Sequence, residues 1–262
     1  MAELDAHGNV DIPVGRRAPE GEHARVERAR AAGHLDPHVA HQFDDAEQQR
    51  SAAALGMWGF LATEVMFFGA LFLLYAVYRS AYQDSFAAAS AHLSRWLGGL
   101  NTLVLLTSSF TMALAVYFTQ IGNRRPQILC LILTLVLGVT FLGIKAVEYH
   151  EKYTDRLIPG RLIPSAPFGP DAHALHLLPG ATLPQVEMFY WIYFAMTGMH
   201  ALHMIIGAGL LSYLIYYSIK GRFDPEYHGP VEIIGLYWHF VDIVWIFLFP
   251  LLYLLGRHFE HG

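Results

Sequence analysis

The sequence predicts an all-α membrane protein, a five-transmembrane-helix bundle that follows a long polar N-terminal arm. Of its 262 residues, 54% are hydrophobic and only 15% are charged. The apolar residues are gathered into five stretches, each long enough for the roughly 20 residues that a helix needs to cross a bilayer. This clustering excludes a soluble globular domain.

The first 54 residues are expected to form a solvated, largely disordered arm. They hold ten acidic residues, six arginines and five histidines, with almost no aromatic residues, and such a composition cannot bury a core. At the end of the arm, Asp44 and Glu47 have the spacing of a helix-capping pair, so we expect a helical lead-in to the first span. No signal-peptide pattern is present, so insertion should begin with that span.

The five spans are expected over residues 55–78, 99–121, 126–149, 187–219 and 232–256, and a short tail follows over residues 257–262. The turn before Pro126 is short, which predicts an antiparallel hairpin of the second and third spans. The fourth span is long enough to tilt or to project from the bilayer. Between the third and fourth spans, residues 150–183 are rich in Pro and Gly and should form an ordered loop.

The charge and the cysteine content exclude several kinds of binding partner and site. The net charge is −5 without a dense Lys/Arg block, which argues against nucleic acid and against a polybasic lipid anchor. The lone Cys130 allows neither an intramolecular disulfide nor a cysteine metal site. Positive charges on the two sides nearly balance, and the long N-terminal arm favours the N-terminus inside and the C-terminus outside.

Several ionisable residues interrupt the spans. Glu64 lies near the middle of the first span, where its charged form is costly unless donors meet it. It is either a proton-handling carboxyl at a lipid cleft or a protonated group hydrogen-bonded to a neighbouring helix, and the two interpretations are compatible. Lys145 and Glu148 share one face of the third span, and we favour an interfacial ion pair with a snorkelling lysine over a proton relay.

Three histidines and an aspartate complete this set. His200 and His203 lie on one stripe of the fourth span, and His239 and Asp242 share one face of the last span and need protein partners. Opposed imidazoles such as His200 and His239 are a possible haem site. A catalytic haem-copper core needs more intramembrane histidines than these, so interhelical hydrogen bonding is the favoured interpretation and no metal is expected.

The segment Tyr237-Trp238-His239-Phe240-Val241-Asp242-Ile243-Val244-Trp245 resembles the final helix of subunit III of the haem-copper oxidases. The surroundings of Glu64, of Glu148, and of His200 with His203 resemble that family in the same order, as does Leu100-Asn101-Thr102. The resemblance covers residues 55–256. The family's long form has seven helices, and this chain is similar to the short five-helix bacterial form, which lacks the first two.

This resemblance implies an accessory subunit of a respiratory terminal oxidase, in the bacterial inner membrane. It implies no haem or copper in this chain, direct packing on the haem- and copper-bearing subunit I, contact with other oxidase subunits and a place in a larger respiratory supercomplex. It further implies bound structural phospholipid and help with proton uptake. Proton-handling candidates are Glu64, Glu148 and Asp242; lipid-contact candidates are Trp58, Lys220, Arg222, His228 and Glu232.

Other functions stay open. A stand-alone proton-coupled transporter would use Glu64, Glu148 and Asp242 as a relay, although the five dissimilar spans show no inverted repeat. A small cytochrome would use His200 and His239 as haem ligands. An accessory chain of a nitric oxide reductase belongs to the same family.

Overall fold

The computed structural model describes residues 42–43, 46–91, 93–155, 157–159, 181–223, 225 and 227–254. Within these ranges there is no β-strand, and five helices are long and apolar enough to cross a membrane. The all-α, five-span prediction is therefore confirmed. The chain divides into two units, residues 1–53 and 54–262. Most of the expected arm, most of the Pro-rich loop and the tail over residues 257–262 lie outside the described residues.

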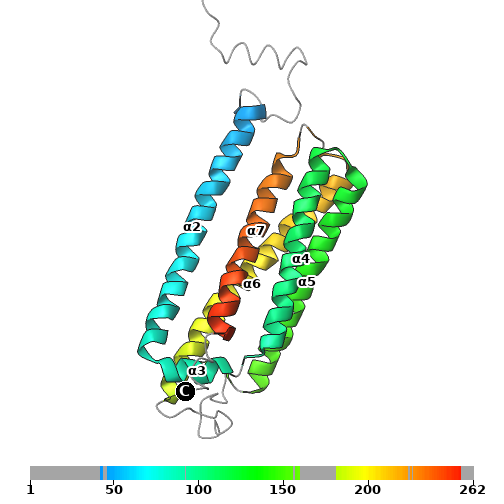
Figure 1. Cartoon of the computed structure of the whole chain (residues 1–262). Coiled ribbons are helices and arrows are strands. Elements are labelled where there is room, and N and C mark those ends of the chain that lie inside the picture. The colour runs from blue at the N-terminus through cyan, green and yellow to red at the C-terminus, as the bar shows by residue number, and fades with distance from the viewer. Residues whose placement is uncertain are drawn as a thin grey trace, which may run out of the picture. The chain divides into compact units, whose positions relative to one another are not determined.

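The described helices, shown in Figure 1, are α2 (Ala46–Ala81), α3 (Gln83–Ala91), α4 (Arg95–Gln120), α5 (Arg124–Thr154), α6 (Leu183–Ile219) and α7 (Gly229–Phe249), which a π-helical turn continues (Pro250–Leu254). The first helix begins at Ala46, nine residues before the expected start of the first span at Leu55, and the capping residue predicted at Asp44 lies outside the described residues. The short α3 was not predicted, because nine residues cannot cross a bilayer and its alanines and serines carry little hydropathy.

Helix α5 ends later than predicted. We expected the third span to end at Tyr149 and an irregular loop to begin at His150, but α5 continues to Thr154. That part of the prediction is wrong, because Lys152 in this extra turn is only 4% exposed and packs into the bundle. Helix α6 has 37 residues, about 56 Å at 1.5 Å per residue, and so exceeds a hydrocarbon core of roughly 30 Å.

The hairpin of α4 and α5 is confirmed. Gly122 adopts a φ of 76° in the turn, a conformation that glycine accepts without strain. The next helix begins with Arg124, whose guanidinium donates from Nε to the carbonyl oxygen of Ser218 at 2.8 Å and from Nη2 to the carbonyl oxygen of Ile219. This arginine therefore fastens the hairpin turn to the C-terminal end of α6, and both lie at the same end of the bundle (Figure 1).

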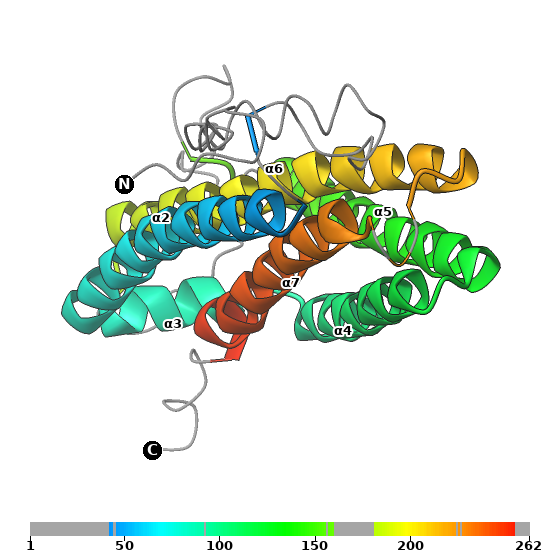
Figure 2. The same ribbon diagram turned by 90° about the horizontal axis from the view of Figure 1, so that it is seen from above.

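Helix α7 occupies a central position among the spans, beside α4 and α6 (Figure 2). Its Trp238 is fully buried and lies against Gly138 of α5 and Gly207 of α6. The indole Nε1 of Trp238 donates to the Ser108 hydroxyl of α4 at 3.1 Å. A single α7 side chain thus contacts three neighbouring helices.

Helix α2 stands apart from α7 in Figure 1. Its contacts with α7 and the π-helical turn are made by aromatic side chains rather than by close backbone packing. Phe68 lies 6.3 Å from Phe240 between ring centroids, and the Tyr75 hydroxyl donates to the carbonyl oxygen of Leu251 at 2.7 Å. Aromatic contacts therefore hold this helix at a wider spacing.

Candidate functional site

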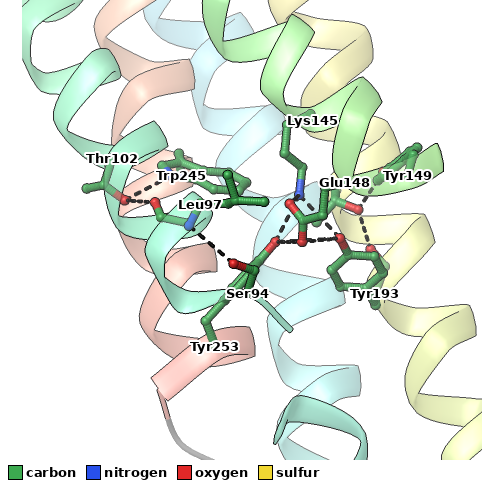
Figure 3. A network of polar contacts seen from close by, with 11 residues as sticks. Ser94, Leu97, Thr102, Lys145, Glu148, Tyr149, Tyr193, Trp245 and Tyr253 are labelled. Carbon is green, nitrogen blue, oxygen red and sulfur yellow. Dashed lines mark hydrogen bonds and ion pairs between the residues drawn. The ribbon is translucent and has the colours of Figure 1, made fainter. Parts of the chain in front are cut away.

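The most enclosed ionic contact joins Lys145 and Glu148, one turn apart on α5. Lys145 Nζ lies 2.9 Å from Glu148 Oε2, and the two residues are 3% and 0% exposed. The ion pair is therefore as predicted, but the snorkelling lysine is not. The ammonium points into the bundle instead of toward the interface (Figure 3), because the partners that satisfy it lie on other helices.

Two tyrosines complete this network. Lys145 Nζ donates to the hydroxyl of Tyr253 at 2.9 Å and to that of Tyr193 at 3.3 Å. Both hydroxyls donate in turn to Glu148 Oε1, at 2.5 Å and 2.9 Å (Figure 3). The ammonium also lies 5.0 Å from the Trp245 ring centroid, within range of a cation–π contact. A buried ion pair is stable only when further hydrogen bonds satisfy it, and here α5, α6 and the π-helical turn supply them.

Glu64 and His203 form a second pair, which joins α2 to α6. His203 Nε2 lies 3.0 Å from Glu64 Oε2, and the side chains are 10% and 18% exposed. His203 Nδ1 lies 2.8 Å from the carbonyl oxygen of Met199. A carbonyl can only accept, so Nδ1 carries a hydrogen. One proton must then lie between Nε2 and the carboxyl, on the ring as an ion pair or on Glu64 as a neutral pair.

His200 does not form the interhelical hydrogen bond that we expected. Both of its ring nitrogens are buried without a partner among the described residues. The ring instead packs against Phe141 and Trp245, with centroids 5.4 Å and 5.3 Å away. The prediction fails because aromatic rings, not polar groups, face this position. A haem at His200 would have to displace both rings, and within the described ranges no cluster of three or more His, Cys, Asp or Glu side chains could hold a metal ion.

His239 and Asp242 face the seam between α7 and α4. Ser109 Oγ lies 2.7 Å from His239 Nδ1, so His239 has the interhelical partner that was predicted. Asp242 is 2% exposed, and the Ser109 hydroxyl lies within interaction range of it. Neither carboxylate oxygen, however, has a hydrogen-bond partner in the described part of the chain. Ser109 of α4 thus lies close to both polar side chains of α7, His239 and Asp242.

The lipid-contact candidates cluster mainly at the end of the bundle that holds the link between α6 and α7. Lys220 lies 4.3 Å from the Tyr216 ring centroid, and Arg222 lies 5.0 Å from that of Tyr217. Trp58 of α2 is 61% exposed. Cationic and aromatic side chains in this arrangement are typical of residues at a membrane interface.

His228 and Glu232 instead contact protein groups. His228 Nε2 lies 3.4 Å from Glu232 Oε1, which also accepts from Gln120 Nε2 at 2.6 Å. These contacts join the start of α7 to the end of α4. Both side chains are partly exposed, so their free edges are still available to a headgroup.

Sequence reasoning missed the residues that complete these contacts. The missed groups are hydroxyls on other helices, those of Tyr193, Tyr253 and Ser109. In addition, the hydroxyls of Thr197 and Tyr149 are hydrogen-bonded to each other at 2.6 Å. Tyrosines that lie within apolar spans, rather than at their ends, were the available signal, because a buried hydroxyl needs a partner.

Comparison with known proteins identifies the family. The family model described as cytochrome c oxidase subunit III matches residues 40–191 and 186–257, which is most of the chain. The chain belongs to the cytochrome c oxidase subunit III family. It is 34% identical over 158 residues to cytochrome c oxidase subunit 3 of Gallus gallus, a match that covers 60% of this chain and 49% of that protein.

Bacterial members of the subunit III family align over more of the chain. The probable quinol oxidase subunit 3 of Staphylococcus haemolyticus is 27% identical, with 84% of this chain and 96% of that protein covered. Cytochrome c oxidase subunit 3 of Alkalihalophilus pseudofirmus is 29% identical, with 77% and 86% covered. The match thus spans about half the length of the chicken protein but nearly all of the staphylococcal one.

Proposed function

We propose that this chain is the accessory subunit III of a bacterial respiratory haem-copper terminal oxidase of the cytochrome c oxidase type. The single observation that carries the proposal is the family match across most of the chain. In this role the chain has no redox centre of its own and is not itself an enzyme. Dioxygen is reduced at haem and copper in subunit I, and this chain packs directly against subunit I in the inner membrane.

Its contribution is to stabilise the catalytic subunit, to hold structural phospholipid and to support proton uptake. The Glu64–His203 pair, which holds one proton at a partly exposed place on the bundle surface, supports the proton part. The cationic and aromatic groups of Lys220 and Arg222, with exposed Trp58, support the lipid part. Glu148 and Asp242 are enclosed and are weaker proton-handling candidates.

The alternative of a stand-alone proton-coupled transporter is less well supported. Such a protein would need Glu64, Glu148 and Asp242 to be connected. Glu64 bonds to His203, Glu148 bonds to Lys145 and two tyrosines, and Asp242 has no hydrogen bond, so no continuous chain of hydrogen bonds links the three within the described residues. An accessory role in a nitric oxide reductase would involve the same surfaces and differs only in the partner.

The test is to tag the chain in its native membrane, extract it in mild detergent and identify every chain that accompanies it. Stoichiometric recovery of a many-helix haem-copper oxidase subunit is the expected result. Recovery of the chain alone, as a stable monodisperse bundle, would overturn the proposal in favour of a transporter. Recovery with a nitric oxide reductase would reassign the complex.

A further inference from the structure

The imidazole of His239 lies at the depth of the hydrocarbon core. It is the eleventh residue of the 26-residue span Gly229–Leu254, about 15 Å from the start of that span at 1.5 Å per residue. Its partner Ser109 is equally central in the span Arg95–Gln120. The polar contact between α4 and α7 is therefore far from both headgroup layers.

One nitrogen of this imidazole is left without a partner. Ser109 occupies Nδ1, and no residue in the described ranges bonds to Nε2, which is also not among the enclosed polar atoms of the bundle. His239 is only partly buried, so its Nε2 edge is not fully enclosed by the described bundle. When Ser109 donates to Nδ1, the neutral ring carries its hydrogen on Nε2 and presents a donor there. Hydrocarbon chains cannot accept it, and an unmade hydrogen bond in lipid is costly.

Hydroxyl groups on the outer faces of the spans are satisfied differently. Thr107 of α4, Thr140 of α5 and Ser212 of α6 are exposed, and each donates to the carbonyl oxygen four residues earlier in its own helix, at 2.8–2.9 Å. These groups need nothing from outside the chain. The open edge of His239 differs from them because its remaining bond can be made only with a group outside the described bundle.

An apolar recess lies along the same helix, and Ile243, one turn after His239, is among its lining residues. It has a volume of about 220 Å³ and is formed where α2 stands apart from α7, between Val65, Phe68 and Phe72 on one side and Phe240, Ile243 and Phe247 on the other. Ile243, which is one turn after His239, is 50% exposed, and Phe247 is 60% exposed. The outer face of α7 thus combines one hydrogen-bonding group, His239 Nε2, with an apolar recess that a side chain of another helix can fill.

We propose that this face of α7, flanked by α4 and α2, docks a membrane-spanning helix of another oxidase subunit. That helix places a hydrogen-bonding group against His239 Nε2 at mid-bilayer depth and an apolar side chain in the recess. A protein helix fits this face better than an acyl chain does. The helix can both hydrogen-bond to the imidazole and place a side chain in the recess, whereas an acyl chain can only fill the recess. The identity of the partner as an oxidase subunit rests on the proposed function, whereas the choice of face rests on the geometry alone.

Photocrosslinking in the native membrane tests the face. A photoreactive side chain replaces Ile243 on the proposed face, and matched variants carry it at Val139 of α5 or Ile205 of α6, which are 54% and 57% exposed. We expect adducts with another oxidase chain from position 243 and not from the control positions. Adducts from 243 with lipid only, or with a second copy of this chain, would overturn the proposal, as would oxidase adducts confined to 139 and 205.

The hydrogen bond is tested separately by His239→Leu, with His239→Gln as the variant that retains a donor and an acceptor. Hydrogen bonds between membrane helices correspond to a roughly 3- to 20-fold change in association, so His239→Leu should weaken retention of the partner in increasingly harsh detergent by that factor. His239→Gln and the control Thr107→Val should retain it. Equal retention by all three would overturn the hydrogen bond at His239.

The two proposals fail in different ways. If the unmodified tagged chain brings down no oxidase subunit, the proposed function is wrong. If it does so while position 243 yields no oxidase adduct, the function stands and the docking face is wrong. Should His239→Leu fail to accumulate, the crosslink at position 243 decides the matter in a chain that keeps His239.

Discussion

At the scale of single residues, the bundle encloses the Lys145–Glu148 ion pair and satisfies both of its ions with tyrosine hydroxyls. Lys145 and Glu148 would be costly to bury alone. Tyr193 and Tyr253 accept from the lysine and donate to the carboxylate, so each hydroxyl serves both ions. The network is therefore a closed set of contacts between α5, α6 and the π-helical turn, and removal of one member leaves the others unsatisfied.

Replacing one ion of this pair should be strongly destabilising. In Glu148→Gln the buried ammonium loses its counter-charge, and we expect a loss of about 3–5 kcal/mol in the free energy of unfolding, measured by denaturant unfolding of the purified protein. The double variant Lys145→Met/Glu148→Gln should recover much of it. The surface control Glu232→Gln should lose no more than about 1 kcal/mol. A similar loss in Glu148→Gln and the control would contradict this account.

Glu64→Gln tests whether the proton shared by Glu64 and His203 takes part in proton uptake by the oxidase complex. Glutamine still hydrogen-bonds to His203, so the haem content of the complex should stay constant, but it cannot release a proton. If this chain supports proton uptake, oxygen consumption or its durability during turnover should change, most visibly at high pH, where protons are scarce. Thr63→Val, next to it and bonded only to its own helix, is the control. Unchanged turnover across pH would leave Glu64 a structural role alone.

The polar residues of the site were predictable one by one, but their pairings were not. Glu64, Glu148 and the histidines stand out because ionisable groups are rare in apolar spans. That Glu64 meets His203, and that His200 meets only aromatic rings, depends on how each helix is rotated about its axis. Rotation is set by packing between residues far apart in sequence, which no local pattern records.

At the scale of elements, the five spans were predictable because their length and apolarity are imposed by the bilayer. Their ends were less so. Helix α5 continues past the apolar stretch to Thr154 because Lys152 finds a buried place in the bundle. The short α3 carries no membrane signal, and Phe86 orders it by packing edge-on against Phe189 of α6, 5.4 Å between centroids.

The contact of the Trp238 side chain of α7 with α5 predicts an opposite response at two glycines of α5. A Cβ at Gly138 would lie 2.6 Å from Trp238 Cη2, whereas nothing lies within 4 Å of one at Gly143. Gly138→Ala should therefore lower the free energy of unfolding by about 1–3 kcal/mol, the usual cost of overpacking. Gly143→Ala should be neutral or up to about 1 kcal/mol more stable. Thermal unfolding in detergent measures both, and equal stability of the two variants would contradict the packing described.

At the scale of the whole molecule, the described residues hold five spans, an odd number, so we expect the two ends of the chain on opposite sides of the membrane. The hairpin turn with Arg124 and Arg125 and the link with Lys220 and Arg222 lie at the end of the bundle where α2 begins (Figure 1). Arg79, Arg95 and Lys152 lie toward the opposite end, so lysine and arginine, which favour the cytoplasmic side, do not decide the orientation.

The orientation itself is a prediction. We expect the N-terminus inside and the C-terminus outside. Reporter fusions that are active on only one side of the membrane should give opposite results at the two ends, with a cytoplasmic reporter active at the N-terminus. A fusion to the turn at Asn123 should match the N-terminal result and serves as the internal control. The reverse pattern would show an inverted chain, and identical results at both ends would contradict five spans.

The central place of α7 also bears on biosynthesis. The ribosome produces this helix after the other four, so those four enter the membrane while the position that Trp238 fills between Gly138 and Gly207 is still empty. The packing around this position is therefore completed only when Gly229–Phe249 has been made. A product that stalls before Gly229 would lack Trp238 and would leave a space the size of an indole between Gly138 of α5 and Gly207 of α6.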